Sequence, residues 1–202
     1  MDNGKHLPLV EQFYSIQGEG FNVGKPAWFI RLGGCDVGCS WCDTKFSWNP
    51  DLHPLVDTDS IIESVRKSAA HAVVVTGGEP SMYNLDYLCS ELKKFDAETF
   101  IETSGAYPLT GEWDWICLSP KQNAPAVPAV FERANELKII VQTKSDLHWA
   151  EVNAEKVNSE CILYLQPEWS QYKKILPVII DYVQKDPRWR ISLQVHKFMN
   201  IP

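Results

Sequence analysis

Hydrophobic residues occur along this chain in short, nearly continuous runs separated by polar or amphipathic stretches. Apolar runs of strand length are typical of a parallel sheet whose two faces are covered. The runs lie at residues 27–32, 72–77, 99–105, 115–120, 136–141, 161–167 and 190–196. The pattern therefore predicts a sheet made largely of parallel strands.

Segments with apolar residues at helical spacing lie between several of these runs. They are residues 60–70, 84–95, 147–157 and 172–185. The first overlaps the capping signal Thr58–Ser60, and Pro177 in the last predicts a kink or a late start. Strands that alternate with helices predict an α/β fold with right-handed crossovers. A complete eight-stranded barrel takes about 250 residues, so a chain of 202 residues favours an open, partial β/α barrel in one domain, residues 1–202.

The composition is that of an ordinary globular chain. A formal net charge of −7 argues against general binding to nucleic acids or membrane surfaces. No apolar stretch is long enough to cross a bilayer, and the N-terminal MDNGKHLPLVEQF lacks the features of a signal peptide. We therefore expect a cytoplasmic protein whose six cysteines are reduced, ligating or buried rather than paired in disulfides.

Polar signatures stand at the ends of the predicted strands. They are Arg31, TGGEP (76–80), ETSG (102–105), SPK (119–121), QP (166–167) and His196. In parallel α/β folds the carboxyl ends of the strands are where sites gather. The repetition of such groups at separate strand ends predicts one site at this edge of the sheet.

Three cysteines lie close together in GGCDVGCSWCDTKFSW (33–48), at Cys35, Cys39 and Cys42. Structural zinc takes four ligands, usually in two separated pairs. A [4Fe–4S] cluster normally takes four thiolates, so three would leave one iron to a small molecule, such as the amino and carboxylate groups of a methionine moiety. The alternative is a fortuitous group or an incomplete zinc knuckle. The other cysteines are scattered, and we expect them to be small buried hydrophobes: Cys89, Cys117 and Cys161.

The spacing C-x3-C-x2-C, with Trp41 before the last cysteine, resembles the signature of the radical S-adenosylmethionine (radical SAM) enzymes. The resemblance implies a partial barrel of that type with a [4Fe–4S] cluster and S-adenosylmethionine. Their shared chemistry generates a 5′-deoxyadenosyl radical that abstracts a substrate hydrogen. TGGEP is similar to the strand end that receives the methionine amino group in that superfamily, although alone it is equally typical of a turn.

A longer series of motifs is similar to the 7-carboxy-7-deazaguanine synthases. In order, they are SIQGEG (15–20), AWFIRLGGC (27–35), CSWCDTKFSW (39–48), TGGEP (76–80), FIETSG (100–105), LSPK (118–121) and LQVHKFMNIP (193–202). Ile16 stands where leucine is expected, and residues 144–160 carry no recognisable motif. The resemblance implies a lyase that converts 6-carboxy-5,6,7,8-tetrahydropterin to 7-carboxy-7-deazaguanine with loss of ammonia, toward queuosine-type 7-deazapurines. It also implies Mg²⁺, a homodimer and a reducing partner such as flavodoxin or ferredoxin.

The same resemblance assigns roles to single residues. The implied substrate contacts are Ile16, Gln17, Gly18, Arg31, Thr76, His196 and Pro202. The implied S-adenosylmethionine contacts are Gly78, Ser104, Ser119, Pro120, Lys121 and Gln166. The implied metal ligands are Cys35, Cys39 and Cys42 for the cluster and Thr44 for Mg²⁺. For Thr44 the alternative is a capping role in the next turn, and its neighbour Asp43 would either support the metal site indirectly or cap or fix the loop.

Four further residues keep more than one interpretation. Glu19 would contact the substrate or only brace its loop, and Glu102 would bind ribose hydroxyls or bond within the barrel. Lys138 would be a functional group or a snorkelling lysine. His196 would contact the substrate or be a buried, satisfied histidine.

Two other functions share some of these features. A small radical-activating enzyme, which abstracts hydrogen from a glycine of a partner protein, has the same cysteine loop but does not need QGEG, Arg31 or Thr44. An iron–sulfur electron carrier would normally complete its cluster with a fourth cysteine near the first three, and the sequence has none there.

Overall fold

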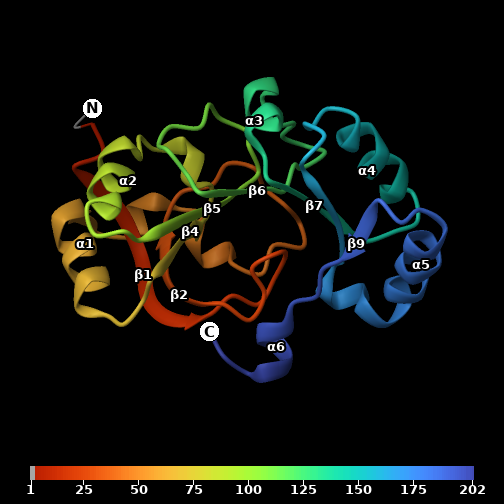
Figure 1. Cartoon of the computed structure of the whole chain (residues 1–202), viewed down its shortest axis with the longest axis horizontal. Helices are drawn as coiled ribbons and strands as arrows, with labels where there is room; N and C mark the ends of the chain where they lie inside the picture. Colours follow the sequence, from red (N-terminus) through yellow and green to blue (C-terminus); the bar gives the residue numbers. More distant parts are fainter. Residues whose placement is uncertain (1–2) are drawn as a thin grey trace.

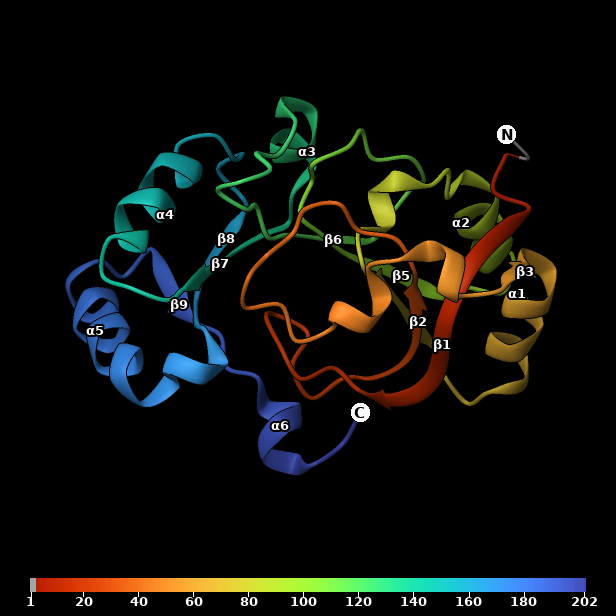
Figure 2. The same cartoon turned by 180° about the vertical axis from the view of Figure 1, so that it is seen from behind.

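One mixed sheet, in the order β3-β1-β2-β4-β5-β6-β7-β8-β9, forms the centre of the computed structural model, which describes residues 3–202. Its strands are β1 (His6–Ile16), β2 (Pro26–Leu32), β3 (Leu55–Asp57), β4 (Ala72–Gly77), β5 (Glu98–Thr103), β6 (Trp115–Leu118), β7 (Glu136–Val141), β8 (Ile162–Pro167) and β9 (Trp189–Ile191). Neighbours from β2 through β9 are parallel, and β1 is antiparallel to both β2 and β3. The sheet curves without closing, with β3 and β9 as its edges (Figure 1, Figure 2). This confirms the predicted open, partial β/α barrel.

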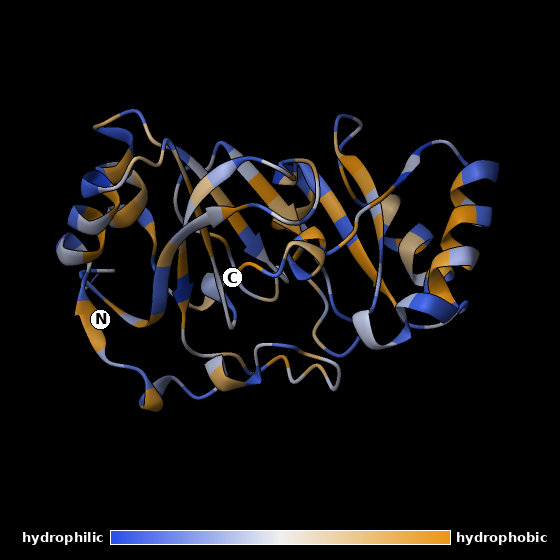
Figure 3. Cartoon of the chain, turned by 90° about the horizontal axis from the view of Figure 1, so that it is seen from below, coloured by the Kyte–Doolittle hydropathy of each residue, from blue (hydrophilic) through white to orange (hydrophobic). Residues whose placement is uncertain are grey.

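Helices cover the outer face of the curved sheet (Figure 1). They are α1 (Thr58–Lys67), α2 (Asp86–Lys93), α3 (Pro128–Arg133), α4 (Asp146–Ala154) and α5 (Tyr172–Lys185), with α6 (Val195–Met199) lying apart near the C-terminus. One hydrophobic core includes Ile61 of α1 and Leu88 of α2, and a second includes Leu147 of α4 and Ile179 of α5. These helices carry both hydrophobic and hydrophilic residues (Figure 3), as expected for elements with one face against a sheet.

The inner face of the sheet carries a different set of side chains. Successive residues of a strand point to opposite faces. On β7, Leu137, Ile139 and Val141 belong to the helix-covered core, whereas Lys138 lines the inner pocket and Glu136 lines a small cavity beside it. The alternation of β7 therefore places two charged residues inside the barrel.

Most predicted elements are present, and two predictions are wrong in part. The runs 72–77, 136–141 and 172–185 coincide with β4, β7 and α5. The strand predicted at 190–196 ends at Ile191, and the chain continues into α6. Pro177 lies inside α5, so the predicted late start is wrong.

The hydrophobic pattern does not reveal β1, β3, α3 or α6. β1 has half-buried residues at many successive positions, so it lacks a clear alternation. The other three have at most six residues, which is too short for a periodic signal.

Two segments from opposite ends of the chain meet at the open side of the barrel. The loop that follows β1 approaches α6 there, and the C-terminus lies beside the end of β1 (Figure 1). The Val195 amide donates to the Gly18 carbonyl at 2.8 Å, and the Ser15 hydroxyl donates to the Pro202 carbonyl at 3.3 Å. Within residues 3–202, no helix has the length and apolarity needed to span a membrane.

Candidate active site

A pocket of about 470 Å³ opens on the inner side of the sheet, at the carboxyl ends of the parallel strands. Every site residue predicted from the sequence except Pro120 lines it. Those residues are Ile16, Gln17, Gly18, Arg31, Cys35, Cys39, Cys42, Thr44, Thr76, Gly78, Ser104, Ser119, Lys121, Gln166, His196 and Pro202. Pro120 is buried between two residues that do line the pocket. The fold therefore gathers at one place residues that are scattered over nearly the whole sequence.

The three cysteines lie on an irregular loop that the backbone attaches to the sheet. The Gly34 amide donates to Ser47, and the Cys35 amide donates to Trp48, so both ends of the loop are joined. All three thiols are free and partly exposed. Burial raises the pKa of the Cys35 and Cys39 thiols, although the charge of Lys121 opposes the shift at Cys39.

This donor set fits an iron–sulfur cluster better than a single metal ion. Among residues 3–202, no three His, Cys, Asp or Glu side chains converge as one metal ion would require. In a four-iron cluster each thiolate binds a different iron, so the thiols need only surround a common space. Cys35, Cys39 and Cys42 do so because they line one pocket.

The segment Gly77–Glu79 lies directly against the cysteine loop. The Gly78 amide donates to Leu32, and the Glu79 amide donates to Gly34, each at 2.8 Å. A Cβ atom at Gly78 would lie 2.1 Å from the Gly34 carbonyl oxygen and 2.9 Å from Cys35 Cβ, so no side chain fits there. This backbone cradle beside the thiols is consistent with a ligand that approaches the cluster closely.

Glu79 fixes this cradle to the next strand. Its buried carboxylate accepts bonds from the amides of Ser81 and Ser104, at 3.0 and 2.7 Å, and from the hydroxyls of Ser81, Thr103 and Ser104. From the sequence, GGEP could be a turn or a binding element. The bonds of Glu79 explain why a turn forms here. Ser104 stands in the pocket because this bond network holds it there.

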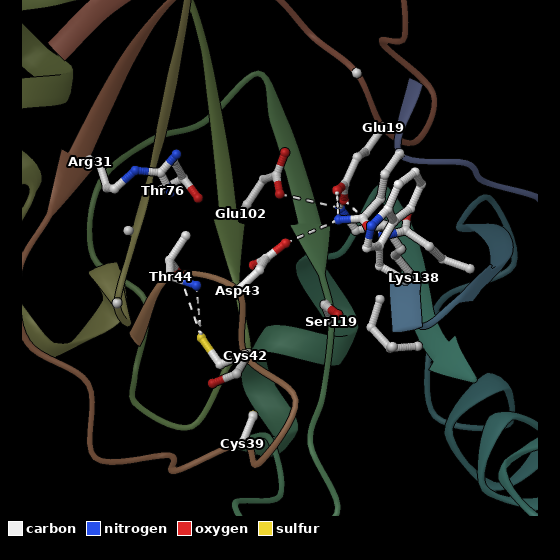
Figure 4. Close-up of a pocket in the computed structure, with 18 of the residues that line it drawn as sticks. Glu19, Arg31, Cys39, Cys42, Asp43, Thr44, Thr76, Glu102, Ser119 and Lys138 are labelled. Atoms are coloured by element: carbon white, nitrogen blue, oxygen red, sulfur yellow. Dashed lines mark hydrogen bonds and ion pairs between the residues drawn. The ribbon is translucent and has the colours of Figure 1, made fainter. Parts of the chain in front are cut away.

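Thr44 and Asp43 follow the last cysteine, and their side chains face the pocket (Figure 4). Thr44 occupies the N-cap position of a short 3-10 turn (Lys45–Ser47), but its side chain makes no capping bond. Its hydroxyl instead lies 3.5 Å from Cys42 Sγ. The capping role predicted for Thr44 is therefore wrong. Asp43 accepts a bond from Lys197 Nζ at 2.7 Å, which is consistent with the loop-fixing role predicted for it.

Arg31 and Thr76 lie beside each other on one side of the pocket (Figure 4), as register partners on β2 and β4. The Arg31 Nε donates to Glu11 at 2.7 Å. This pair fixes the base of the guanidinium, whose remaining donors can bind a carboxylate in the pocket.

A charged group lies on the other side of the pocket (Figure 4). Lys138 Nζ donates to Glu19 at 2.5 Å and to Glu102 at 3.2 Å. Gln17 donates to the second Glu102 oxygen at 2.8 Å, and Gln194 donates to Glu19 at 2.9 Å. Lys138 is only 3% exposed, so it is not a snorkelling lysine. We call Glu19, Glu102 and Lys138 the charged triad.

The ammonium of the triad is buried, whereas its two carboxylates are partly exposed. Burial alone would raise the pKa of Glu19, but the charge of Lys138 and the amide donors around it lower that pKa to about 2. Burial opposes the charged form of Lys138 as well, yet the surrounding acidic groups raise its pKa well above the usual value. Two carboxylates and one ammonium leave a net negative charge facing the pocket.

Lys121 and His196 also line the pocket. Lys121 is partly buried and donates to the Ser119 hydroxyl at 2.7 Å, and desolvation lowers its pKa. His196 lies on α6 rather than at a strand end and is partly exposed, so the alternative of a buried histidine is wrong. A Cβ atom at Gly18 would lie 2.4 Å from His196 Nδ1, which makes glycine necessary for this approach.

Several lining residues escape prediction from the sequence, among them Phe13, Phe29, Trp48, Trp169 and Lys197. Lys197 pairs with Asp43 across 154 residues of sequence, and its ammonium lies 5.0 Å from the Trp169 ring. No local spacing signals such contacts. Only LQVHKFMNIP, taken as a motif, directs attention to the end of the chain.

Comparisons with known proteins point to one family, and together they cover the whole chain. The model of the radical SAM superfamily matches residues 29–119. A 7-carboxy-7-deazaguanine synthase from Flavobacterium psychrophilum is 53% identical over 202 residues, which are 100% of this chain and 96% of that protein. One from Synechocystis is 44% identical, covering 96% of this chain and 93% of the relative. The crystal structure of QueE from Escherichia coli has a TM-score of 0.85 at 30% identity and covers 97% and 99% of the two chains.

Proposed function

Because this chain belongs to the 7-carboxy-7-deazaguanine synthase family of radical SAM enzymes, we propose that its pocket binds the carboxytetrahydropterin substrate between Arg31 and the charged triad. The reaction is the rearrangement of 6-carboxy-5,6,7,8-tetrahydropterin to 7-carboxy-7-deazaguanine with loss of ammonia. The supporting observation is the convergence of the predicted site residues in one pocket. Full-length similarity to the synthases leaves the radical-activating enzyme and the electron carrier without support.

Cofactor binding falls to the side of the pocket beside the cysteine loop. We assign the cluster to Cys35, Cys39 and Cys42. We assign S-adenosylmethionine to Gly78, Ser104, Ser119, Lys121 and Gln166, with Pro120 as the residue that joins Ser119 to Lys121. When bound, the cluster and S-adenosylmethionine supply the radical that abstracts a substrate hydrogen. The chain itself contributes the cradle at Gly77–Glu79 and the partly buried ammonium of Lys121.

The charged groups on the two sides of the pocket complement groups of the substrate. The Arg31 guanidinium suits the substrate carboxylate, with Thr76 beside it. The pyrimidine edge of a pterin presents N–H donors, which the Glu19 and Glu102 carboxylates can accept. Although burial opposes it, the charge of Lys138 helps to lower the pKa of Glu19 to about 2, so this carboxylate is ionised before the substrate arrives.

The remaining substrate contacts close the pocket from outside. We assign Ile16 and Gly18 to backbone contacts, Gln17 to an amide contact, and His196 and Pro202 to contacts from the C-terminal segment. The bond between Ser15 and Pro202 holds the chain end against β1, where it can exclude water from the bound pterin. Excluding water protects a radical intermediate from side reactions.

We assign Mg²⁺ to Thr44. One hydroxyl is sufficient because Mg²⁺ commonly takes few protein ligands and completes its octahedron with substrate and water. Thr44→Ala should remove the stimulation of turnover by Mg²⁺, and Thr44→Ser should keep it. Equal stimulation of Thr44→Ala and wild type by Mg²⁺ would contradict the assignment.

Three further proposals rest on the family resemblance alone. They are a homodimer, a flavodoxin or ferredoxin as reductant, and a place in the cytoplasm within a route to queuosine-type 7-deazapurines. Sedimentation of the purified protein tests the first, since a monomeric mass at micromolar concentration would exclude a stable dimer.

Reconstitution tests the function itself. The protein is loaded anaerobically with iron and sulfide and incubated with S-adenosylmethionine, dithionite and 6-carboxy-5,6,7,8-tetrahydropterin. The expected result is 7-carboxy-7-deazaguanine, formed faster with Mg²⁺. A loaded protein that cleaves S-adenosylmethionine but leaves the pterin unchanged would overturn the proposal.

A further inference from the structure

The loop between β1 and β2 (residues 17–25) supplies Gln17, Gly18 and Glu19 to the pocket, although it has no regular secondary structure. Two backbone bonds close its base, from the Gln17 amide to Lys25 and from the Gly24 amide to Gln17, each at 2.8 Å. These bonds fix where the loop leaves the sheet. They do not fix the direction of its tip, so something else must hold Glu19 toward Lys138.

Contacts among three residues outside the pocket hold the tip of this loop, and one of the three, Phe21, belongs to the loop itself. The Phe21 ring stacks on the Trp115 ring, with centroids 4.5 Å apart and planes 16° from parallel. The Phe21 amide and Trp115 Nε1 both donate to Glu136 Oε2, at 3.0 and 2.9 Å. One buried carboxylate oxygen thus joins the loop to the first residues of β6 and β7. We call Phe21, Trp115 and Glu136 the clamp.

The loop packs closely against the clamp at Gly20. A Cβ atom at Gly20 would lie 2.0 Å from Glu136 Oε1, and the Gly20 φ of +65° also favours glycine. The Gly20 amide donates to the Ser192 hydroxyl at 2.9 Å. The residue that follows Glu19 is therefore fixed by contacts on both sides.

The clamp and the pocket share a wall. A cavity of about 10 Å³ lies between them, with Gln17, Glu19 and Glu102 on the pocket side and Trp115 and Glu136 on the clamp side. Lys138 stands two residues after Glu136 on β7, so both side chains leave the same face of the strand. The carboxylate that holds Phe21 and the ammonium that holds Glu19 are consequently fixed by one strand.

We propose that Phe21, Trp115 and Glu136 are positioning residues that set the placement of Gln17 and Glu19 for the pterin. The proposal rests on the proposed function and adds residues that lie outside the pocket. Phe21 is 48% exposed, so loss of its ring exposes little new core. A purely structural role predicts a small loss of stability and no kinetic effect, whereas positioning predicts a kinetic effect without loss of the fold.

The test uses the loaded enzyme with Phe21→Ala and Trp115→Phe, which remove the stack and the indole N–H in turn. We expect KM for the carboxytetrahydropterin to rise about 3- to 10-fold, with kcat within about twofold. KM for S-adenosylmethionine and the iron content should not change. The fraction of S-adenosylmethionine cleaved without product formation should increase. Glu136→Gln keeps an oxygen for both donors and should raise KM less than Phe21→Ala does.

Two matched variants separate positioning from stability. Ile180→Ala removes a hydrophobic side chain that is 37% exposed on α5, away from the pocket. Glu151→Gln alters a carboxylate that accepts from Trp189 Nε1 at 2.8 Å, as Glu136 does from Trp115. Both should lower the melting temperature slightly and leave the pterin KM unchanged.

Hydrogen exchange on the protein without cofactors gives a second readout. The amides of residues 18–21 should exchange faster in Phe21→Ala than in wild type, and not in Ile180→Ala. Wild-type values of the pterin KM and of uncoupled cleavage in both clamp variants would overturn the proposal. Failure of the wild-type protein to turn over the pterin would instead count against the proposed function, and unchanged exchange in Phe21→Ala would still refute the clamp.

Discussion

The cysteine loop (residues 33–48) and the charged triad face the same pocket, but different kinds of contact hold them. Around the cysteines the backbone bonds are local, from Cys42 to Cys39 and from Ser47 to Thr44, whereas distant segments bond to other groups of the loop, such as its Gly34 carbonyl and its Asp43 carboxylate, rather than to the thiols. In the triad, Lys138 and Glu19 are 119 residues apart in sequence, and the amide of Gln194 that supports Glu19 is 175 residues from it.

The two kinds of contact suit two different tasks, binding the cofactors and binding the substrate. The loop presents partly exposed thiols on an irregular backbone, which suits a group that organises its own ligands. In the triad Lys138 is buried and both carboxylates are partly buried, and the charges are satisfied by protein partners from several elements. We infer that the cofactor side depends on its metal for final order, whereas the substrate side is organised by the protein.

Loss of the cluster should have the greatest consequence. Cys39→Ala removes one of the three proposed ligands, so activity should fall to background and the iron content and visible absorbance after anaerobic reconstitution should fall with it. Cys161→Ala is the control, because Cys161 is buried away from the pocket. Normal iron content in Cys39→Ala would contradict the assignment of the loop.

The next effect concerns the triad. Lys138→Met leaves the partly buried carboxylates of Glu19 and Glu102 without their cation, which should lower the free energy of unfolding by about 3 kcal/mol, the low end of the cost for a fully buried pair. The exposed pair of Lys94 and Glu91, at 2.6 Å, provides the control. Lys94→Met should cost no more than about 1 kcal/mol. Denaturant unfolding measures both, and equal costs would mean that the triad is no more organised than a surface pair.

A smaller effect is the pH dependence of stability. The folded pKa of Glu19, about 2, lies below its ordinary value of 4.5, so its contribution is complete above about pH 4.5 and is lost as the pH falls toward 2. At pH 6 Glu19→Gln should lower the melting temperature by about 3–10 °C. The difference from wild type should narrow between pH 4.5 and pH 2. A difference that stays constant over this interval would show that the charge of Glu19 contributes nothing.

Local patterns in the sequence were enough to predict the architecture and most of the pocket. Alternating apolar runs and helical segments predict the open barrel, and Cys35, Cys39 and Cys42 predict a metal-binding loop, because both signals depend on spacings within a few residues of each other. The motif series also directs attention to residues at separate strand ends. Parallel strands bring those ends to one edge of the sheet, which is why they meet in one pocket.

The pairing of these groups became visible only in the folded chain. Lys138 has the pattern of a strand residue, and nothing near it in sequence identifies Glu19 and Glu102 as its partners. The same holds for Phe21 with Trp115, and for α6, whose first amide pairs with Gly18 rather than with β9. Such pairings depend on strand register and on where distant segments cross the barrel, and those are set by the packing of the whole chain rather than by any local spacing.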